Sequence, residues 1–450
     1  MLDVLLKNIS KHVIYPLYDL KDHSSKLAEL KQLEKTQWDS SEELKTRQWA
    51  SLQKIINYAY RYSPYYKHLF LENGIEPGDI KTYADYLQVP VTTKQHIRDN
   101  IDRFISTQFN KDQLLTAKTG GSTGVSLSLF FDERCEEKRN AAAIRSDRWA
   151  GWDLGDVKAS LWGNPPKADT LKKLFRNTFL DRVIYLDTMN LNPASMTAFK
   201  DSWRKHKPAV IYGHAHSIYM WAKHLKSENI TDLRPKGIIS TSMMLLAHER
   251  LLIEEVFQCK VSDRYGCEEV GLIASECELH NGMHLNIDHL YVEFINDLNQ
   301  PIKAGESGKI VLSDFNNLAM PLLRYRVEDV GTPSDRLCEC GRGLPVIEKV
   351  EGRVADFLKK KDGSLVAGIS LVERTLTKIN GLEQMQIVQN ALDEIQINRV
   401  KGSGFTESTD INLRKEFENV FGADVQIDIA DVDKIPQETS GKYRFSICKI

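Results

Sequence analysis

The first hundred residues are patterned as helices. From residue 44 onward, apolar side chains recur at spacings that place them on one buried helix face: Leu44, Trp49, Leu52, Ile55, Ile56 and Tyr60. Ser63-Pro64 ends this run, because proline cannot continue a helix. Another short helix is predicted over residues 93–100, after a turn at Pro90.

Residues 1–20 carry a separate apolar stripe at helical spacing: Leu5, Leu6, Ile9, Val13 and Ile14. We expect this stripe to pack on a core. Peripheral contact with a membrane surface is the alternative.

Residues 115–330 alternate strand-like runs with helix-like runs. Strands are predicted over 160–162, 183–186, 209–212, 237–240, 289–294 and 309–313, and helices over 133–148, 193–205, 218–228 and 247–256. This alternation indicates layered α/β architecture.

The pattern restarts after Gly352. It predicts strands over 364–366, 385–389, 394–400 and 425–429, and helices over 371–378 and 411–421. We therefore expect two domains: residues 1–352, with a helical lead-in over 1–100, and a small α+β domain over 353–450.

Composition narrows the function classes. The 450 residues are 42% hydrophobic and 27% charged, which is typical of globular proteins. The net charge of −2 provides no basic field for nucleic acid, and no apolar run reaches the roughly 18–20 residues of a membrane-spanning helix. Seven cysteines, an odd number in a long chain, argue against a disulfide framework, so the cytoplasm is the expected compartment.

The first motif that suggests a ligand site is a loop rich in glycine and hydroxyl side chains, which is followed by the strand-like run 127–131. Its residues are Thr119, Gly120, Gly121, Ser122, Thr123 and Gly124. Glycine lets the backbone approach a ligand closely, and N–H and hydroxyl groups suit phosphate oxygens. The loop lacks the Gly-Lys-Ser/Thr ending of a Walker A motif. A nucleotide-phosphate loop and an ordinary turn both fit this segment alone.

Four more motifs follow in order. They are Tyr265-Gly266-Cys267-Glu268-Glu269, Leu323-Arg324-Tyr325-Arg326-Val327-Glu328-Asp329, Gly352-Arg353-Val354-Ala355-Asp356 and Ser440-Gly441-Lys442-Tyr443-Arg444. Together with the loop, they resemble the adenylate-forming superfamily of acyl-CoA synthetases. The phenylacetate–coenzyme A ligase family, including relatives encoded in capsular-polysaccharide loci, is the more similar branch, since residues 63–66 and 87–94 also resemble it.

The resemblance implies a large domain of layered α/β sheets and a small mobile C-terminal lid. It also implies that a small carboxylic acid attacks the α-phosphate of ATP, with Mg²⁺, to give an acyl adenylate and pyrophosphate. The thiol of coenzyme A then displaces AMP. Two alternatives stay open: transfer to an amine, sugar or carrier in surface-polysaccharide synthesis, and a non-catalytic nucleotide-binding role. The oligomeric state, a homodimer included, is also open.

The resemblance assigns roles residue by residue. Residues 119–124 would hold the β- and γ-phosphates, Tyr265 and Gly266 would flank adenine, and Ser242 would approach adenine or the acyl group. Asp329 would accept hydrogen bonds from ribose, and Arg353 would contact ribose or phosphate.

The two residues proposed as catalytic are Glu269 and Lys442. Glu269 would ligate Mg²⁺, and Lys442 would reach the α-phosphate and the carboxylate. Glu268 departs from the family pattern, which has Ser or Thr there, so it could serve the metal or recognise a polar or cationic acyl group. The hinge residue is uncertain because Ala355 stands where relatives carry a charged residue.

Tyr212, His214 and His216 lie where relatives place acyl-pocket residues, although a structural histidine is equally consistent with either position. Separately, Cys277 and His280 with Cys338 and Cys340 would supply four N/S ligands for a structural zinc, as some relatives do. His284 is the substitute for His280, and reduced cysteines without metal are the alternative.

Overall fold

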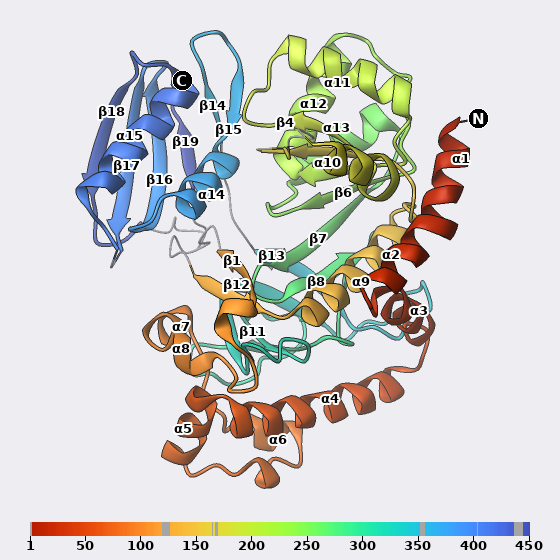
Figure 1. Ribbon diagram of the computed structural model, residues 1–450, viewed down its shortest axis with the longest axis vertical. Coiled ribbons are helices and arrows are strands. Elements are labelled where there is room, and N and C mark those ends of the chain that lie inside the picture. Colours follow the sequence, from red (N-terminus) through yellow and green to blue (C-terminus); the bar gives the residue numbers. More distant parts are fainter. Residues whose placement is uncertain are drawn as a thin grey trace.

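An eleven-stranded sheet occupies the middle of the computed structural model (Figure 1). The structure describes residues 2–118, 127–163, 165–166, 170–351, 356–402, 404–435 and 444–450. Within these ranges, no helix combines the length and the apolar character that crossing a bilayer requires.

The sheet changes from parallel to antiparallel pairing at β7. Its order is β10-β11-β12-β13-β9-β8-β7-β6-β5-β3-β4. The strand bounds are β3 Lys158–Trp162, β4 Val183–Asp187, β5 Val210–His214, β6 Gly237–Thr241, β7 Val261–Cys267, β8 Gly271–Glu276, β9 Met283–Leu285, β10 Leu290–Ile295, β11 Gly308–Asp314, β12 Tyr325–Ser334 and β13 Val346–Glu351. Strands β3 to β7 pair in parallel, whereas β7 and β8 pair antiparallel. In open α/β sheets, ligands bind beyond the carboxyl ends of such parallel strands.

Helices cover the parallel half, as the alternating pattern predicted. They are α9 Glu133–Trp149, α11 Pro193–His206, α12 Ala215–Ser227 and α13 Ala247–Phe257. The start of α11 is encoded locally, because Asn192 caps the backbone N–H of Ser195 and Pro193 occupies the first turn. The helices and strands predicted between residues 115 and 330 are all confirmed, with ends within three residues.

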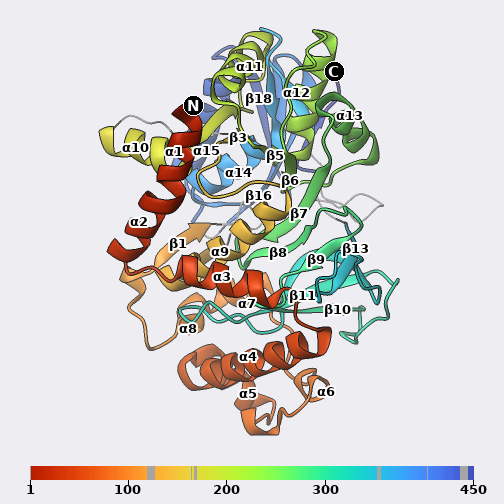
Figure 2. The ribbon, with the colours of Figure 1, turned by 90° about the vertical axis from the view of Figure 1, so that its right-hand side faces the viewer.

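The N-terminal helices start along one flank of the molecule and continue across the lower end of the view in Figure 2. They are α1 Leu2–Ile9, the π-helical η1 Ser10–Ile14, α2 Tyr15–Lys21, α3 Lys26–Thr36, α4 Ser41–Tyr62 and α5 Pro64–Glu72, followed by α6 Tyr83–Tyr86, α7 Lys94–Asp99 and α8 Ile101–Phe104. A capping box at Ser40 starts α4, and Ser63 ends it as predicted, while Pro64 opens α5. The predicted face of α4 lies in or against the main core.

The prediction that the apolar stripe in residues 1–20 packs on a core is only partly confirmed. Leu6, Ile9 and Ile14 are half-buried, but the side chains of Leu5 and Val13 are exposed to solvent. Leu5 is already exposed in α1, and beyond Ser10 the chain passes into a π-helix, which shifts the helical phase before Val13.

The C-terminal residues form a second sheet with its own core (Figure 1). Its order is β18-β17-β16-β19, from β16 Leu382–Ala391, β17 Glu394–Lys401, β18 Gln426–Asp431 and β19 Ser446–Cys448, and it packs with α14 Gly368–Lys378 and α15 Glu407–Phe421. A hairpin of β14 Phe357–Lys359 and β15 Leu365–Ala367 precedes α14. The α+β restart predicted after Gly352 is confirmed.

Several contacts hold the C-terminal unit against the larger one, among them hydrogen bonds of Thr188, Leu191 and Arg98. Leu191 and Leu365 exchange backbone hydrogen bonds of 2.8 and 2.6 Å. Arg98 of α7 donates two hydrogen bonds to the Glu383 carboxylate, at 2.7 and 2.8 Å. This half-buried bidentate pair connects α7 to β16.

Candidate active site

A cavity of about 490 Å³ lies at the carboxyl ends of the parallel strands, between the large sheet and α14. From the large unit it is lined by Lys94, Lys118, Trp162, Tyr212, Thr241, Ser242, Tyr265, Gly266, Glu268, Glu269 and Asp329. From α14 it is lined by Ser370, Glu373, Arg374, Thr377 and Lys378. The fold thus brings seven of the residues proposed from sequence to one cavity: Tyr212, Ser242, Tyr265, Gly266, Glu268, Glu269 and Asp329.

Tyr265 and Asp329 lie side by side in this cavity. The Tyr265 hydroxyl donates a 2.8 Å hydrogen bond to Asp329 Oδ2. Tyr265 lies near the end of β7, at a register shift between β7 and β8. Gly266 is required there because a Cβ would lie 2.6 Å from the Gly271 carbonyl oxygen. Ser242, directly after β6, has a φ of 64°, an uncommon conformation that concentrates at ligand sites.

Glu269 is a buried carboxylate that stays ionised. Tyr325 donates a 2.8 Å hydrogen bond to Glu269 Oε1, and the Lys94 ammonium lies 3.5 Å from the same oxygen. Burial alone would raise the pKa of Glu269, but the charge of Lys94 and the Tyr325 hydrogen bond outweigh it, so the pKa is lowered. An ionised carboxylate that lines a cavity is a suitable ligand for a hard cation such as Mg²⁺.

Glu268 behaves in the opposite way. Burial in the cleft, and then the neighbouring charge of Glu269, raise the pKa of the Glu268 carboxyl. Its backbone carbonyl accepts a hydrogen bond from Arg139 at 3.3 Å, while its side chain lines the cavity. The two adjacent acids therefore differ electrostatically, although they look alike in the sequence.

Neither His214 nor His216 is among the described residues that line the cavity. His214 is fully buried behind Trp162, with ring centroids 4.1 Å apart, and neither ring nitrogen has a hydrogen-bond partner among the described residues. Burial lowers the pKa of His214 to about 4, so the ring is neutral at pH 7. The ring of His216 is hydrogen-bonded to Glu249 and packs against Phe357. Contact of either histidine with the substrate therefore stays a prediction.

Trp162 and Lys94 are cavity residues that the sequence analysis did not propose. Trp162 ends β3 and stacks against Tyr212, with ring centroids 5.8 Å apart. Lys94 opens α7 after the Thr93 cap, and its side chain is almost fully buried. In the sequence, Lys94 could have been noticed because it ends the segment 87–94, which resembles the family. Its burial beside Glu269, which suggests its role, depends on the tertiary structure.

Three proposed elements lie outside the described residues: the loop 119–124, Arg353 and Lys442. Their flanks are described. The loop connects β1 Leu115–Lys118 to β2 Ser128–Phe131, an antiparallel hairpin in which Lys118 pairs with Ser128. Since Lys118 lines the cavity, the hairpin directs the chain toward it just before the loop begins.

A separate group of metal-binding side chains lies away from the cavity. The ligand atoms of Cys277, His284, Cys338 and Cys340 all lie within 4.8 Å of one another. The Cys277 and Cys338 sulfurs are 3.8 Å apart, and Cys340 Sγ is 3.3 Å from His284 Nε2. A tetrahedron with Zn–S bonds of about 2.3 Å has edges of about 3.8 Å, so the spacing fits zinc. His284 Nδ1 donates to the Leu344 carbonyl at 3.0 Å, which leaves Nε2 to bind metal.

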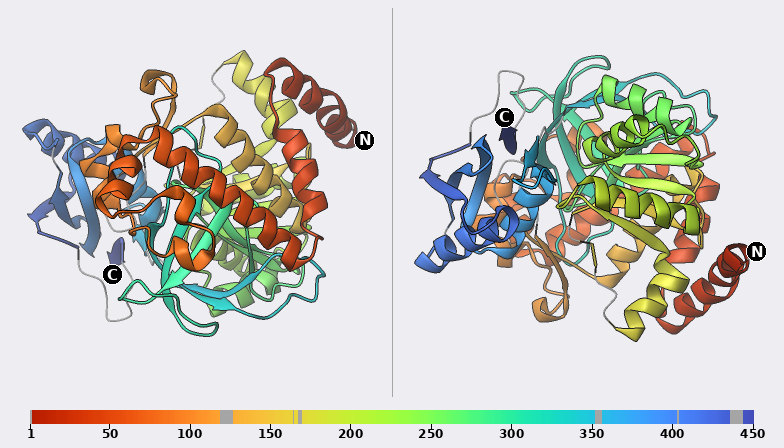
Figure 3. Two further views of the ribbon diagram at one scale, coloured as in Figure 1. Left: turned by 90° about the horizontal axis from the view of Figure 1, so that it is seen from below. Right: turned by 90° about the horizontal axis from the view of Figure 1, so that it is seen from above.

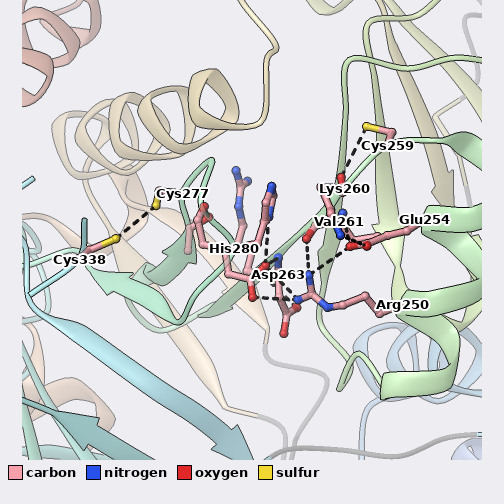
Figure 4. A network of polar contacts seen from close by, with 12 residues as sticks. Arg250, Glu254, Cys259, Lys260, Val261, Asp263, Cys277, His280 and Cys338 are labelled. Carbon is pink, nitrogen blue, oxygen red and sulfur yellow. Dashed lines mark hydrogen bonds and ion pairs between the residues drawn. The ribbon is translucent and has the colours of Figure 1, made fainter. Parts of the chain in front are cut away.

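His280, the histidine first expected in this set, belongs elsewhere. Its Nδ1 lies 3.5 Å from Glu276 Oε2, within the network of Arg250 and Asp263. Figure 4 shows His280 on the side of that network and Cys277 facing Cys338. His284 takes the place expected for His280 because it lies on β9, which pairs with β13 beside the loop that carries Cys338 and Cys340.

The comparisons with known proteins agree with this architecture. Residues 358–449 match the family model described as the CapK C-terminal domain. Protein CapK of Staphylococcus aureus is 24% identical over 410 residues, which cover 88% of each chain. A phenylacetate-coenzyme A ligase of Aromatoleum evansii is 23% identical over 436 residues, covering 92% of this chain and 96% of that protein.

Solved structures show the same fold. A 2-hydroxyisobutyryl-CoA ligase in complex with 2-HIB-AMP and CoA, in the thioesterification state, superposes with a TM-score of 0.62 at 17% identity and 91% coverage of both chains. The same ligase in its postadenylation state gives a TM-score of 0.60 at 18% identity, covering 91% of this chain and 90% of that one.

Proposed function

From its homology to the phenylacetate-coenzyme A ligases and its adenylate-forming fold, we propose that this protein activates a carboxylic acid with ATP and transfers the acyl group to coenzyme A. The observation that carries the proposal is the convergence of Tyr265, Glu269 and Asp329 on one cavity from distant parts of the chain. A nucleotide site needs an aromatic surface, a diol acceptor and an ionised metal ligand, and these three residues supply them.

The nucleotide would lie along the ends of β6 and β7. The Asp329 carboxylate accepts hydrogen bonds from the ribose hydroxyls, and the bond from Tyr265 fixes its orientation. Residues 119–124 hold the terminal phosphates, Arg353 contacts ribose or phosphate, and Glu269 holds Mg²⁺, which would neutralise phosphate charge. Lys94 keeps Glu269 ionised before the metal arrives.

The acyl group would lie against Trp162 and Tyr212, whose stacked rings form the aromatic wall of the cavity. Lys442 supplies a positive charge between the substrate carboxylate and the α-phosphate. We place the domain boundary at residues 352–353, so that Lys442 belongs to a lid that moves between the two half-reactions.

The test is pyrophosphate release with ATP and Mg²⁺, with hydroxylamine as the trap, across aryl, fatty, hydroxy and amino acids. We expect acid-dependent release of pyrophosphate and, on adding coenzyme A, an acyl thioester. Release without thioester formation would favour an amine, sugar or carrier acceptor. Absence of release with every acid, from folded protein that binds ATP, would favour the non-catalytic role.

We also propose that Cys277, His284, Cys338 and Cys340 hold a structural zinc ion. The proposal is supported by the four-ligand N/S set and by the second hydrogen bond of His284. This site lies apart from the residues that line the cavity, so its role would be in stability.

A further inference from the structure

Glu268 is an acidic side chain of the cavity to which the proposed activity gives no role. It lies in the turn between β7 and β8, and its carboxyl group makes no hydrogen bond or ion pair with the residues that the structure describes. The guanidinium of Arg139 is nearby, but it donates to the backbone carbonyls of Glu268 and Glu269 and pairs with Asp314 at 2.9 Å.

The two adjacent glutamates have different neighbours. The Glu269 carboxylate is bound on the side of β12 and α7, by Tyr325 and Lys94. Glu268 lies near enough to Tyr212 of β5 for its charge to act there: burial raises the pKa of Tyr212, and the charge of Glu268 raises it further. Figure 1 shows β6 on one side of β7 and β12 with α7 on the other. Glu268 is therefore separated from the groups that hold Glu269.

Tyr212 belongs to the aromatic wall proposed for the acyl group. Its ring stacks on Trp162, with an angle of 14° between the ring planes. The Lys158 ammonium and the Arg264 guanidinium lie 5.8 and 5.9 Å from the centre of the Tyr212 ring, and both are bound to the buried Asp147 carboxylate. This end of the cavity thus combines two aromatic rings with a carboxyl group that no described cation binds.

The small domain adds basic side chains to the opposite wall of the cavity. Figure 3 shows this domain in blue, at the end of the molecule opposite to the N-terminus. Its helix α14 supplies Arg374, which pairs with Glu416 at 2.6 Å, and Lys378 in the last turn. Neither forms an ion pair with Glu268 in the described part of the chain. The partner of the Glu268 carboxyl group is thus left to water or to a bound ligand.

An acyl group that fills this end of the cavity displaces water from Glu268. Removing water from a carboxyl group without replacing its hydrogen bonds is unfavourable, and more so when the group is charged. An unsubstituted alkyl or aryl acid incurs this penalty. An acid that carries a hydroxyl or a protonated amine avoids it, because the substituent supplies a hydrogen-bond donor.

We propose that Glu268 selects the acid, by accepting a hydrogen bond from a hydroxyl or protonated amine on an acyl group that lies against Trp162 and Tyr212. This inference rests on the proposed activation of a carboxylic acid and names the class of acid. It makes Glu268 a residue that contacts the substrate, whereas Glu269 alone of the two acids serves Mg²⁺.

The test compares matched acids by pyrophosphate release with ATP and Mg²⁺. The aliphatic set is butanoate, 3-hydroxybutanoate and 3-aminobutanoate, and the aryl set is phenylacetate, 4-hydroxyphenylacetate and 4-(aminomethyl)phenylacetate. In at least one set, we expect kcat/KM for an acid with the donor to exceed that for the unsubstituted acid by at least about tenfold. The hydroxy and amino members of each set show which donor the site takes.

Two variants examine the role of the carboxyl group. Glu268→Met removes the acceptor at a similar side-chain length, so the preference for the donor should disappear while release with the unsubstituted acid is retained. Glu268→Gln keeps an acceptor oxygen without the charge, so it should keep a preference for a hydroxyl and lose one for an amine. Glu42→Gln is the control, because Glu42 is exposed on α4 and does not line the cavity.

Isothermal titration of the same acids measures binding without turnover and separates this inference from the proposed activity. A binding preference that Glu268→Met abolishes, in a protein that releases no pyrophosphate, would reject the activity and support the inference. Two results would overturn the inference. One is equal binding of the matched acids by the wild type. The other is an equal loss of release with every acid in Glu268→Met, together with a higher Mg²⁺ requirement, which would identify Glu268 as a metal ligand.

Discussion

Adjacent carboxylates in the cavity show how the surroundings of a residue determine its chemistry. Lys94 and Tyr325 lower the pKa of Glu269, whereas burial and the charge of Glu269 raise the pKa of Glu268. Glu269 therefore suits a cation at pH 7. Glu268 gains a proton more readily and suits a donor or acceptor role toward a polar group.

Asp263 is another carboxyl whose pKa is shifted by its surroundings, and the shift can be tested. Burial, and then the charge of Glu276, raise the pKa of Asp263 to about 7. Because the folded-state pKa lies above the unfolded value, the stability that this group contributes is fully present below about pH 4 and is lost as the pH rises through 7. We expect Asp263→Asn to be more stable than the wild type at pH 8, by on the order of a few kcal/mol, with the difference shrinking toward pH 4.

Chemical denaturation at pH 4, 6 and 8 measures this effect. Asp153→Asn is the control of opposite sign, because Lys11 and Arg148 outweigh burial and lower the pKa of Asp153. It should therefore destabilise the protein at pH 8. A stability difference for Asp263→Asn that does not change with pH would contradict the assignment.

At the scale of elements, the proposed zinc site fastens two connections that have little regular structure. The segment between β8 and β9 carries Cys277, and the connection from β12 to β13 carries Cys338 and Cys340. These connections join antiparallel strands, and Trp149 of α9 packs beside them. A metal ion there would hold the two connections together.

The histidine assignment leads to a paired experiment. His284→Ala should lose zinc, measured by elemental analysis, and its melting temperature should fall by several degrees, because structural zinc contributes folding free energy. His280→Ala is the matched control and should keep one zinc per chain. A chelator should lower the melting temperature of the wild type and of His280→Ala, but should have little effect on His284→Ala. Retention of zinc by His284→Ala, or its absence from the wild type, would reject the site.

At the scale of the whole molecule, the cavity is closed by α14 from a domain with its own sheet and core. Among the described residues, the polar links across this interface include the Arg98–Glu383 pair, the Leu191–Leu365 backbone bonds and the bonds that join Thr188 to Ser370 and Ala367. Such an interface is compatible with rotation of the small domain between two half-reactions.

A Lys442 variant would test whether this lysine serves only the first of the two proposed half-reactions. We expect Lys442→Ala to lower acid-dependent pyrophosphate release by at least about 100-fold, because a charge that acts only on the α-phosphate is removed. Thioester formation from supplied acyl adenylate and coenzyme A should stay within about threefold of the wild type.

Lys415→Ala, an exposed lysine on α15 of the same domain, is the control and should leave both rates unchanged. Normal adenylation by Lys442→Ala would show that the lid assignment is wrong. Equal loss of both half-reactions would indicate a general structural defect.

The sequence by itself determined the elements and their order, because hydrophobic periodicity and caps such as Asn192 and Thr93 act over a few residues. It also determined the likeness to adenylate-forming enzymes, because the motifs around Tyr265, Asp329 and Lys442 occur in order along the chain. The tertiary structure decided what depends on distant contacts. It selected His284 over His280 through the β9–β13 pairing and placed Trp162 in front of His214. It also buried Lys94 beside Glu269 and left Leu5 and Val13 of the N-terminal stripe exposed. These outcomes could not be read from local pattern, because each depends on residues brought together from separate segments.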